Sequence, residues 1–184
     1  MNKAVVQDLG WFSSHDRQSD GVYLFKDVDW DKQRADVVAC TDACLSGLGF
    51  FFERSKEGFQ CLVPDQAPKD SIFYFKALAV VSVVDTVTWL ADVPSKLLTY
   101  SDNTNTVDIF HSLHSLPAYN ELLKFTISLL IKHGISLRVV HVSGIDNSVA
   151  DSLSRFENTR AIAECPGLSI SSFQPPCVAL GPEL

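Results

Sequence analysis

The sequence is poor in basic side chains. Only 15 lysines and arginines stand against 22 aspartates and glutamates in 184 residues, which gives a formal net charge of −7. A protein that holds nucleic acid unaided usually presents a basic face, because neutralising phosphates supplies most of the affinity. The shortage of positive charge therefore argues against strong autonomous binding of nucleic acid. It still allows a domain that a neighbouring domain of a longer chain holds on its substrate.

Paired cysteines are also missing. The chain has an odd number of cysteines and no C-x2-C pair, which argues against a disulfide framework or a structural zinc site. We therefore expect free thiols and a reducing, intracellular setting, in the cytoplasm or nucleus. The five residues are Cys40, Cys44, Cys61, Cys165 and Cys177.

No long uninterrupted apolar run is present. Residues 1–20 lack the apolar core of a signal peptide, so we expect none. The most apolar stretch, residues 72–93, is interrupted by Lys76, Asp85 and Asp92. These charges favour a buried helix over a membrane span, and we expect no membrane association.

The composition divides the chain into three parts. Residues 1–35 are polar and broken, and we expect a lead-in segment anchored by Trp11 and Trp30. Residues 36–157 carry the regular patterns of one domain with a real core. Residues 158–184 contain four prolines and predict a linker or extended strap.

Hydrophobic patterning predicts the element order β-β-β-α-β-α-α-β-α in the central part. Three consecutive strands indicate an antiparallel meander, and later strands separated by helices indicate parallel crossovers. The expected fold is therefore α/β, a five-stranded mixed sheet with helices on both faces. The expected strands are 37–42, 50–53, 59–63, 96–102 and 135–142, and the expected helices are 72–92, 104–113, 118–133 and 147–156.

Capping residues mark several helix ends. Asp70 or Ser71 is expected to cap the helix that starts near residue 72, and Gly134 to end the helix that precedes it. Asn147 is expected to cap the last helix rather than to take part in chemistry.

Three aspartates stand at the ends of regular elements. Asp42 ends the first strand, Asp102 ends the fourth, and Asp151 opens the last helix. Carboxylates converging at strand ends are typical of a site for Mg²⁺ or Mn²⁺, which prefer oxygen ligands. Each has a simpler interpretation: a turn residue for Asp42, a helix cap for Asp102, and a first-turn acid favoured by the helix dipole for Asp151.

The segments around these aspartates resemble a known family. TDACLSGLGFFF, YSDNTNTV and HVSGIDNSVADSLSR are similar to the ribonuclease H domain of retroelement reverse transcriptases, above all tyrosine-recombinase (DIRS-like) and related eukaryotic elements. The ending FQPPCVALG resembles the segment that follows this domain there. The resemblance covers roughly residues 20–181 and implies the ribonuclease H-like fold.

The resemblance also implies an activity and its residues. The family hydrolyses the RNA strand of RNA–DNA hybrids with two Mg²⁺ or Mn²⁺ ions, next to a polymerase domain of the same polyprotein. Asp42 would bridge both ions, and Asp102 and Asp151 would complete their shells. His141 matches a histidine implicated in proton transfer and product release, although a lone histidine at a strand end is ordinarily structural.

Lys76 departs from the family pattern. The family has a glutamate in a setting like FEALAV, where this chain has FYFKALAV. An ammonium has no acceptor and repels a nearby cation, so we expect weakened binding of one metal and cleavage slowed by at least about a hundredfold. Asp70 and Asp85 point away from the Lys76 face of the helix, and Glu53 is the remaining stand-in.

Two other positions for Lys76 stay open. In one it forms a salt bridge with Asp42 or Asp102 and stabilises a metal-free domain, and in the other a shifted helix places it at the surface.

Other functions fit the sequence less well. The runner-up is a non-catalytic domain of the same fold that serves as a structural or protein-interaction module, like the connection domains of reverse transcriptases. A serine hydrolase would need a G-x-S-x-G elbow, which is missing. His111 and His114 have H-x2-H spacing, but nothing nearby completes a zinc set.

Overall fold

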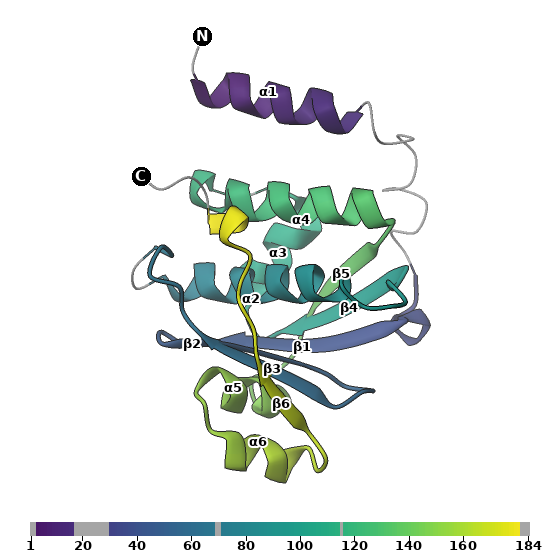
Figure 1. The fold of residues 1–184 in the computed structure, drawn as a ribbon, viewed down its shortest axis with the longest axis vertical. Coiled ribbons are helices and arrows are strands. Elements are labelled where there is room, and N and C mark those ends of the chain that lie inside the picture. The colour runs from purple at the N-terminus through teal and green to yellow at the C-terminus, as the bar shows by residue number, and fades with distance from the viewer. Residues whose placement is uncertain (1–2, 17–29, 69–70, 115, 181–184) are drawn as a thin grey trace.

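A six-stranded mixed sheet forms the centre of the molecule (Figure 1). The computed structural model describes residues 3–16, 30–68, 71–114 and 116–180. The strand order is β5-β4-β1-β2-β3-β6, with β1, β2 and β3 antiparallel and the other pairs parallel. The strands are β1 (Val37–Ala43), β2 (Gly47–Phe52), β3 (Glu57–Leu62), β4 (Lys96–Ser101), β5 (Ser136–His141) and β6 (Ser169–Ser172).

Helices cover both faces of the sheet (Figure 1). On one face lie α2 (Ile72–Val87), α3 (Thr104–Ser112) and α4 (Asn120–His133), and on the other lie α5 (Ser148–Ser154) and α6 (Asn158–Glu164). The chain also forms α1 (Lys3–Asp16) and the short helices η2 (Lys32–Arg34), η3 (Pro117–Tyr119) and η4 (Cys177–Leu180). The predicted fold class and the predicted element order from residue 37 to residue 154 are confirmed.

The expected number of strands was too small by one. Residues 169–172, within the expected strap, form β6 and pair in parallel with β3. The segment SISS is short and mostly polar, so it shows no strand periodicity, yet it satisfies backbone groups along the edge of β3. The division of the chain into three parts at residues 35 and 157 stays a prediction.

Helix α2 ends five residues earlier than expected. The prediction ran to residue 92, but Thr88 closes the helix, and Trp89 is 82% exposed. Ser71 takes the N-cap position without a side-chain capping bond, and Asp70 lies outside the described residues. Gly134 ends α4 with φ of 65°, as predicted, because glycine adopts left-handed backbone without strain.

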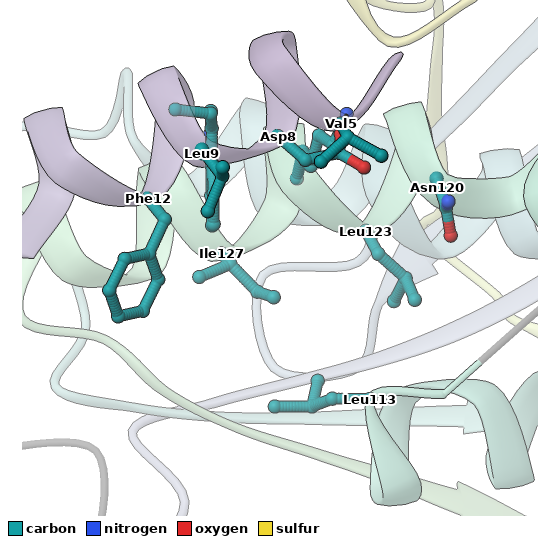
Figure 2. Close-up of a pocket in the computed structure, with 10 residues that line it drawn as sticks. Val5, Asp8, Leu9, Phe12, Leu113, Asn120, Leu123 and Ile127 are labelled. Atoms are coloured by element: carbon teal, nitrogen blue, oxygen red, sulfur yellow. Dashed lines mark ion pairs between the residues drawn. The ribbon is translucent and has the colours of Figure 1, made fainter. Parts of the chain in front are cut away.

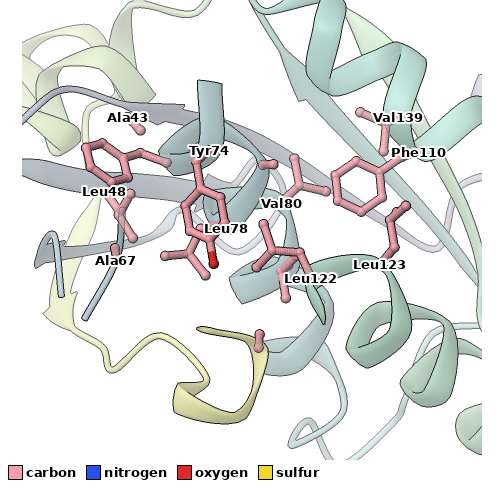
Figure 3. Packing of buried hydrophobic residues seen from close by; sticks show 14 residues of the cluster. Ala43, Leu48, Ala67, Tyr74, Leu78, Val80, Phe110, Leu122, Leu123 and Val139 are labelled. Atoms are coloured by element: carbon pink, nitrogen blue, oxygen red, sulfur yellow. The ribbon is translucent and has the colours of Figure 1, made fainter. Parts of the chain in front are cut away.

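The main core lies between α2, α4 and the sheet (Figure 3). Eleven residues of α2 are buried, so this helix has little freedom to rotate or slide. Leu78 and Val80 pack with Leu122 and Leu123 of α4, and Leu48 adds the contribution of β2. This packing fixes the direction in which the polar side chains of α2 point.

Two glycines let α5 lie directly on β2. A methyl group at Gly49 would overlap the backbone nitrogen of Ser154 and come within 2.8 Å of the carbonyl carbon of Leu153. A methyl group at Gly47 would overlap the carbonyl oxygen of Ser154 and meet the Phe156 ring at 2.8 Å. The glycines in LSGLGFFF therefore set how closely α5 approaches the sheet.

The close approach predicts a strong effect of Gly49→Ala. Because the clash is with backbone, α5 must move, and we expect a loss of about 3 kcal/mol in the free energy of unfolding. Gly10→Ala is the matched control, since a methyl group there meets nothing within 4 Å and helix propensity improves. Urea denaturation measures both variants. Equal stability of the two would contradict direct packing of α5 on β2.

The two tryptophans of the N-terminal part make different contacts. Trp30 is 2% exposed and packs with Leu98 of β4. Its Nε1 donates a hydrogen bond to Ser136 Oγ at 2.9 Å. Trp11 of α1 donates to Ser128 Oγ of α4 at 3.2 Å. Beside this contact, an open groove of about 450 Å³ lies between α1 and α4, and apolar side chains line much of it (Figure 2).

The five cysteines, all within the described ranges, are free thiols. In the same ranges, no helix combines the length and the apolar character that a membrane span requires.

Candidate active site

Two aspartates meet one lysine where β1 and β4 end. The parallel register pairs Thr41 with Ser101, so the residues that follow, Asp42 and Asp102, come to the same edge of the sheet. Lys76, in the second turn of α2, places Nζ 2.6 Å from Asp42 Oδ1 and 2.5 Å from Asp102 Oδ1. The ammonium therefore lies between the two carboxylates and donates a hydrogen bond to each.

Burial strengthens this bridge. The side chain of Lys76 is 13% exposed, and those of Asp42 and Asp102 are 4% and 23% exposed. Burial alone would lower the pKa of Lys76, but its hydrogen bonds to Asp102 and Asp42 raise the pKa, so the amine stays charged. Burial raises the pKa of Asp42 to about 6, with Lys76 opposing the shift and the charge of Asp102 adding to it. Asp42 therefore takes up a proton at a higher pH than an ordinary aspartate does.

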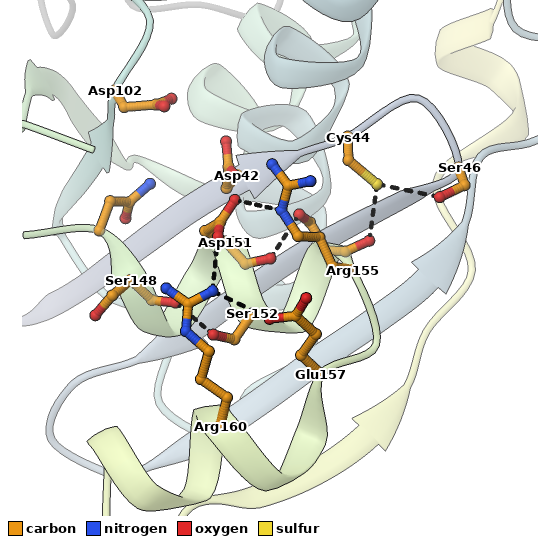
Figure 4. A network of polar contacts seen from close by, with 12 residues as sticks. Asp42, Cys44, Ser46, Asp102, Ser148, Asp151, Ser152, Arg155, Glu157 and Arg160 are labelled. Carbon is orange, nitrogen blue, oxygen red and sulfur yellow. Dashed lines mark hydrogen bonds and ion pairs between the residues drawn. The ribbon is translucent and has the colours of Figure 1, made fainter. Parts of the chain in front are cut away.

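Asp151 lies on α5 and is held by two arginines (Figure 4). Its Oδ1 accepts a hydrogen bond from Arg155 Nε at 2.7 Å, and its Oδ2 lies 3.4 Å from Arg160 Nη1. The hydrogen bond to Asp151 is the main cause of the raised pKa of Arg155, and the charge of Asp42 also contributes. Figure 4 shows Asp151 in the same region as Asp42, but the oxygens of Asp151 are engaged with guanidinium groups.

His141 ends β5 at the same edge. The register pairs it with Ser101, and the next residue, Val142, donates its N–H to the Ser101 carbonyl at 3.0 Å. His141 is exposed. It lies beside Ser101 in the sheet, and Ser101 directly precedes Asp102. Its role in proton transfer stays a prediction.

Comparison with solved structures identifies the fold. An RNase H1 named LC11, crystallised with an RNA/DNA hybrid, superposes with a TM-score of 0.53 at 14% identity, over 64% of this chain and 92% of that one. RNase H1 from the archaeon Halobacterium salinarum gives 0.53 at 11%, over 70% and 98%. The N-terminal RNase H domain of a Mycobacterium tuberculosis protein gives 0.53 at 12%, over 70% and 98%. This chain has the ribonuclease H-like fold.

Sequence comparison adds little to this. No protein-family model matches the chain. An uncharacterised protein of Methanocaldococcus jannaschii is 30% identical over 79 residues, which span 43% of this chain and 66% of that protein, just under two thirds of its length. The ribonuclease H-like fold therefore rests on the structural comparison.

The residues as arranged do not fit a divalent metal ion. Among the described residues, no group of three histidine, cysteine, aspartate or glutamate side chains is placed to hold one. Asp42 and Asp102 direct oxygens at the Lys76 ammonium, which offers three donors and no acceptor. Asp151 directs its oxygens at Arg155 and Arg160. The assignment of the three aspartates as metal ligands stays a prediction.

Several sequence alternatives can now be decided. Lys76 bridges both aspartates, so the interpretation with Lys76 at the surface is wrong. Asn103, not Asp102, caps α3 by accepting from the Thr106 N–H at 2.8 Å. Glu53 does not stand in for a ligand, because it lies beside the start of β1 and accepts from Cys40 Sγ at 3.4 Å.

The prediction that Asn147 caps the last helix is right for its position and wrong for its side chain. Asn147 stands at the N-cap position of α5, but its side chain makes no capping bond. Its Nδ2 instead donates to the Thr41 carbonyl at 2.9 Å, across 106 residues of sequence. Arg160, which also contacts Glu157 and Glu164, was missed as well, because i, i+3 and i, i+4 spacing on α6 indicates only local pairs.

The raised pKa of Asp42 predicts a pH dependence of stability. A carboxyl whose folded pKa exceeds its unfolded value of 3.8 adds stability that is complete below 3.8 and lost as the pH rises through about 6. The wild type should therefore gain up to about 3 kcal/mol from Asp42 as the pH falls from 8 to 4. Asp42→Asn should remove this part of the dependence. If the free energies of unfolding of the two proteins change with pH in the same way, the raised pKa of Asp42 is refuted.

Proposed function

We propose that this chain is a ribonuclease H domain of retroelement reverse transcriptase descent whose hydrolytic site is impaired by Lys76. Its ancestral reaction is two-metal hydrolysis of the RNA strand of an RNA–DNA hybrid. The observation that carries the proposal is the Lys76 ammonium between Asp42 and Asp102, within 2.6 Å of both. A tethered monovalent cation lies between carboxylates of the kind that hold divalent cations.

Fold and motif together support the ancestral substrate. LC11 RNase H1, one of the structural neighbours, was crystallised with an RNA/DNA hybrid. The segments that resemble retroelement domains contain Asp42, Asp102, His141 and Asp151. Asp42 and Asp102 follow paired positions of β1 and β4, His141 ends the neighbouring β5, and Asp151 lies on α5, which packs against β1. The net charge of −7 implies weak grip of a hybrid by the isolated domain. We infer that a polymerase domain of the same polyprotein supplies most of the affinity for the hybrid.

Lys76 opposes the reaction in two ways. It removes the carboxylate that the family places on this helix, and it neutralises the attraction of Asp42 and Asp102 for a cation. Loss of one major electrostatic contributor typically slows an enzyme about a hundredfold or more. We therefore expect cleavage at least about a hundredfold slower than an intact site would give.

A cleavage assay tests this proposal. Wild type and Asp42→Asn are incubated with a labelled RNA–DNA hybrid in Mg²⁺ or Mn²⁺, beside an RNase H1 of established activity. The Asp42→Asn variant lacks the carboxylate expected to bridge both ions. We expect wild-type cleavage at or near the level of this variant, because Lys76 already impairs the wild-type site. Robust wild-type cleavage that Asp42→Asn abolishes would show a working site and overturn the impairment.

A second candidate function is a structural or protein-interaction module of the same fold, like a connection domain. The closed ion-pair bridge favours it, since Lys76 balances buried negative charge that otherwise needs a metal. Calorimetric titration of Lys76→Glu with Mn²⁺ separates the two candidates. A pure scaffold shows no specific binding in this variant, whereas an impaired nuclease regains one site that Asp102→Asn removes.

A further inference from the structure

Asn147 connects the two elements that carry Asp42 and Asp151. It is 2% exposed, and its Nδ2 donates to the carbonyl of Thr41, the residue directly before Asp42. Its own carbonyl accepts from the Asp151 N–H at 3.0 Å, and its N–H donates to the Gly144 carbonyl at 3.3 Å. One buried residue therefore joins the end of β1, the first turn of α5 and the turn between β5 and α5.

The turn at residues 143–147 also adjoins Asp102. A methyl group at Gly144 would lie 3.9 Å from Asp102 Oδ2, in ordinary van der Waals contact. The bond from Asn147 to Gly144 closes this turn. Asn147 thus has a short hydrogen-bonded path to Asp42 and to Asp151, and the turn that it closes adjoins Asp102.

The orientation of the Asn147 amide has an energetic cost. A peptide carbonyl only accepts, so Nδ2 must face Thr41 and Oδ1 must face the other way. Oδ1 is buried and has no hydrogen-bond partner among the described residues. A buried acceptor without a partner is unfavourable, and a leucine of similar volume would avoid the cost. Packing alone therefore does not account for asparagine here, whereas a need for its donor does.

We propose that Asn147 is the positioning residue of this site. Its amide holds the first turn of α5 against the end of β1 and so fixes where α5 carries Asp151 relative to Asp42. The proposal rests on the proposed function only in taking these aspartates as the site. It predicts a local loosening of α5 when the donor is removed, rather than a uniform loss of stability.

Amide hydrogen exchange followed by NMR tests the proposal with three variants. Asn147→Asp keeps the shape but loses the donor when ionised, and Asn147→Leu loses the donor at every pH. Asn103→Asp is the matched control: it adds the same charge next to Asp102, and its carboxylate still caps α3.

At pH 7.5 we expect both Asn147 variants to lose at least tenfold in the protection factor of the Asp151 amide relative to the amides of β1. Asn103→Asp should keep the wild-type ratio. At a pH low enough to protonate the introduced acid, Asn147→Asp regains an O–H donor and should recover the ratio, while Asn147→Leu should not. The titratable groups nearby, Asp42, Asp146 and Asp151, are the same in both, so the leucine variant reports their contribution.

Three results would overturn the positioning role. These are unchanged protection in Asn147→Asp, protection that falls equally in every element, and recovery at low pH in the leucine variant as well. Should Asn147→Leu fail to fold, the pH series of Asn147→Asp still decides, because donor present and donor absent are compared in one protein. The assay uses neither metal nor hybrid, so robust hybrid cleavage by the wild type would overturn the proposed impairment without affecting this result.

Discussion

Lys76→Glu should raise cleavage of an RNA–DNA hybrid in Mn²⁺ by at least about a hundredfold over the wild type. The substitution replaces the ammonium between Asp42 and Asp102 with a carboxylate on the same turn of α2. The packing of α2 on α4 and the sheet fixes where this side chain points, so the new carboxylate faces the same two aspartates. Three acidic groups would then face one cation-sized space, which is what Mg²⁺ or Mn²⁺ needs.

Lys76→Gln is the control for this gain. Glutamine removes the positive charge and offers only a neutral oxygen, so it should recover much less activity than glutamate. Rates are measured with labelled hybrid at several Mn²⁺ concentrations, and Lys76→Glu with Asp102→Asn should lose the gain. Equal rates for wild type and Lys76→Glu would defeat the idea that Lys76 impairs an ancestral nuclease site.

Lys76→Met should cost about 3 kcal/mol of unfolding free energy at pH 8, because it leaves the buried Asp42 carboxylate without its partner. Asp42 then becomes easier to protonate, so its pKa rises further. Since the neutral acid needs no counter-charge, the loss should shrink as the pH falls towards 5. Urea denaturation across this range measures both the size and the pH dependence of the effect.

Lys124→Met is the matched control for this effect. Lys124 also pairs with two acids, Asp8 at 2.6 Å and Glu121 at 2.9 Å, but both partners are about half exposed. Exposed ion pairs contribute less than about 1 kcal/mol, so we expect a small loss that hardly changes between pH 5 and pH 8. Equal losses in the two variants would mean that Lys76 contributes no more than a surface lysine.

The sequence predicted the parts of the molecule that local patterns encode. The β-branched run before Asp42, the segment KLLTYS before Asp102 and the spacing around Leu122 and Leu130 each indicated the correct element. Once strand order followed from these elements, the shared position of Asp42 and Asp102 at one sheet edge followed too. The chemistry of Lys76 was predictable because an ammonium cannot serve as a metal ligand.

Long-range contacts of single polar groups could not be predicted. The bond from Asn147 to the Thr41 carbonyl joins residues 106 positions apart, and asparagine before a helix usually indicates only a cap. Strand β6 was missed because SISS acquires its pairing from the free edge of β3 rather than from its own pattern. The contact between Arg160 and Asp151 depends on where α6 packs. The spacing of residues along the chain does not indicate that position.

Crystals of the wild type soaked in Mn²⁺ test the central claim most directly, because anomalous scattering locates the ion. Our account predicts Lys76 Nζ within hydrogen-bond distance of Asp42 and Asp102, with no Mn²⁺ between the two carboxylates. A Mn²⁺ ion bound there, with Lys76 turned away, would contradict it.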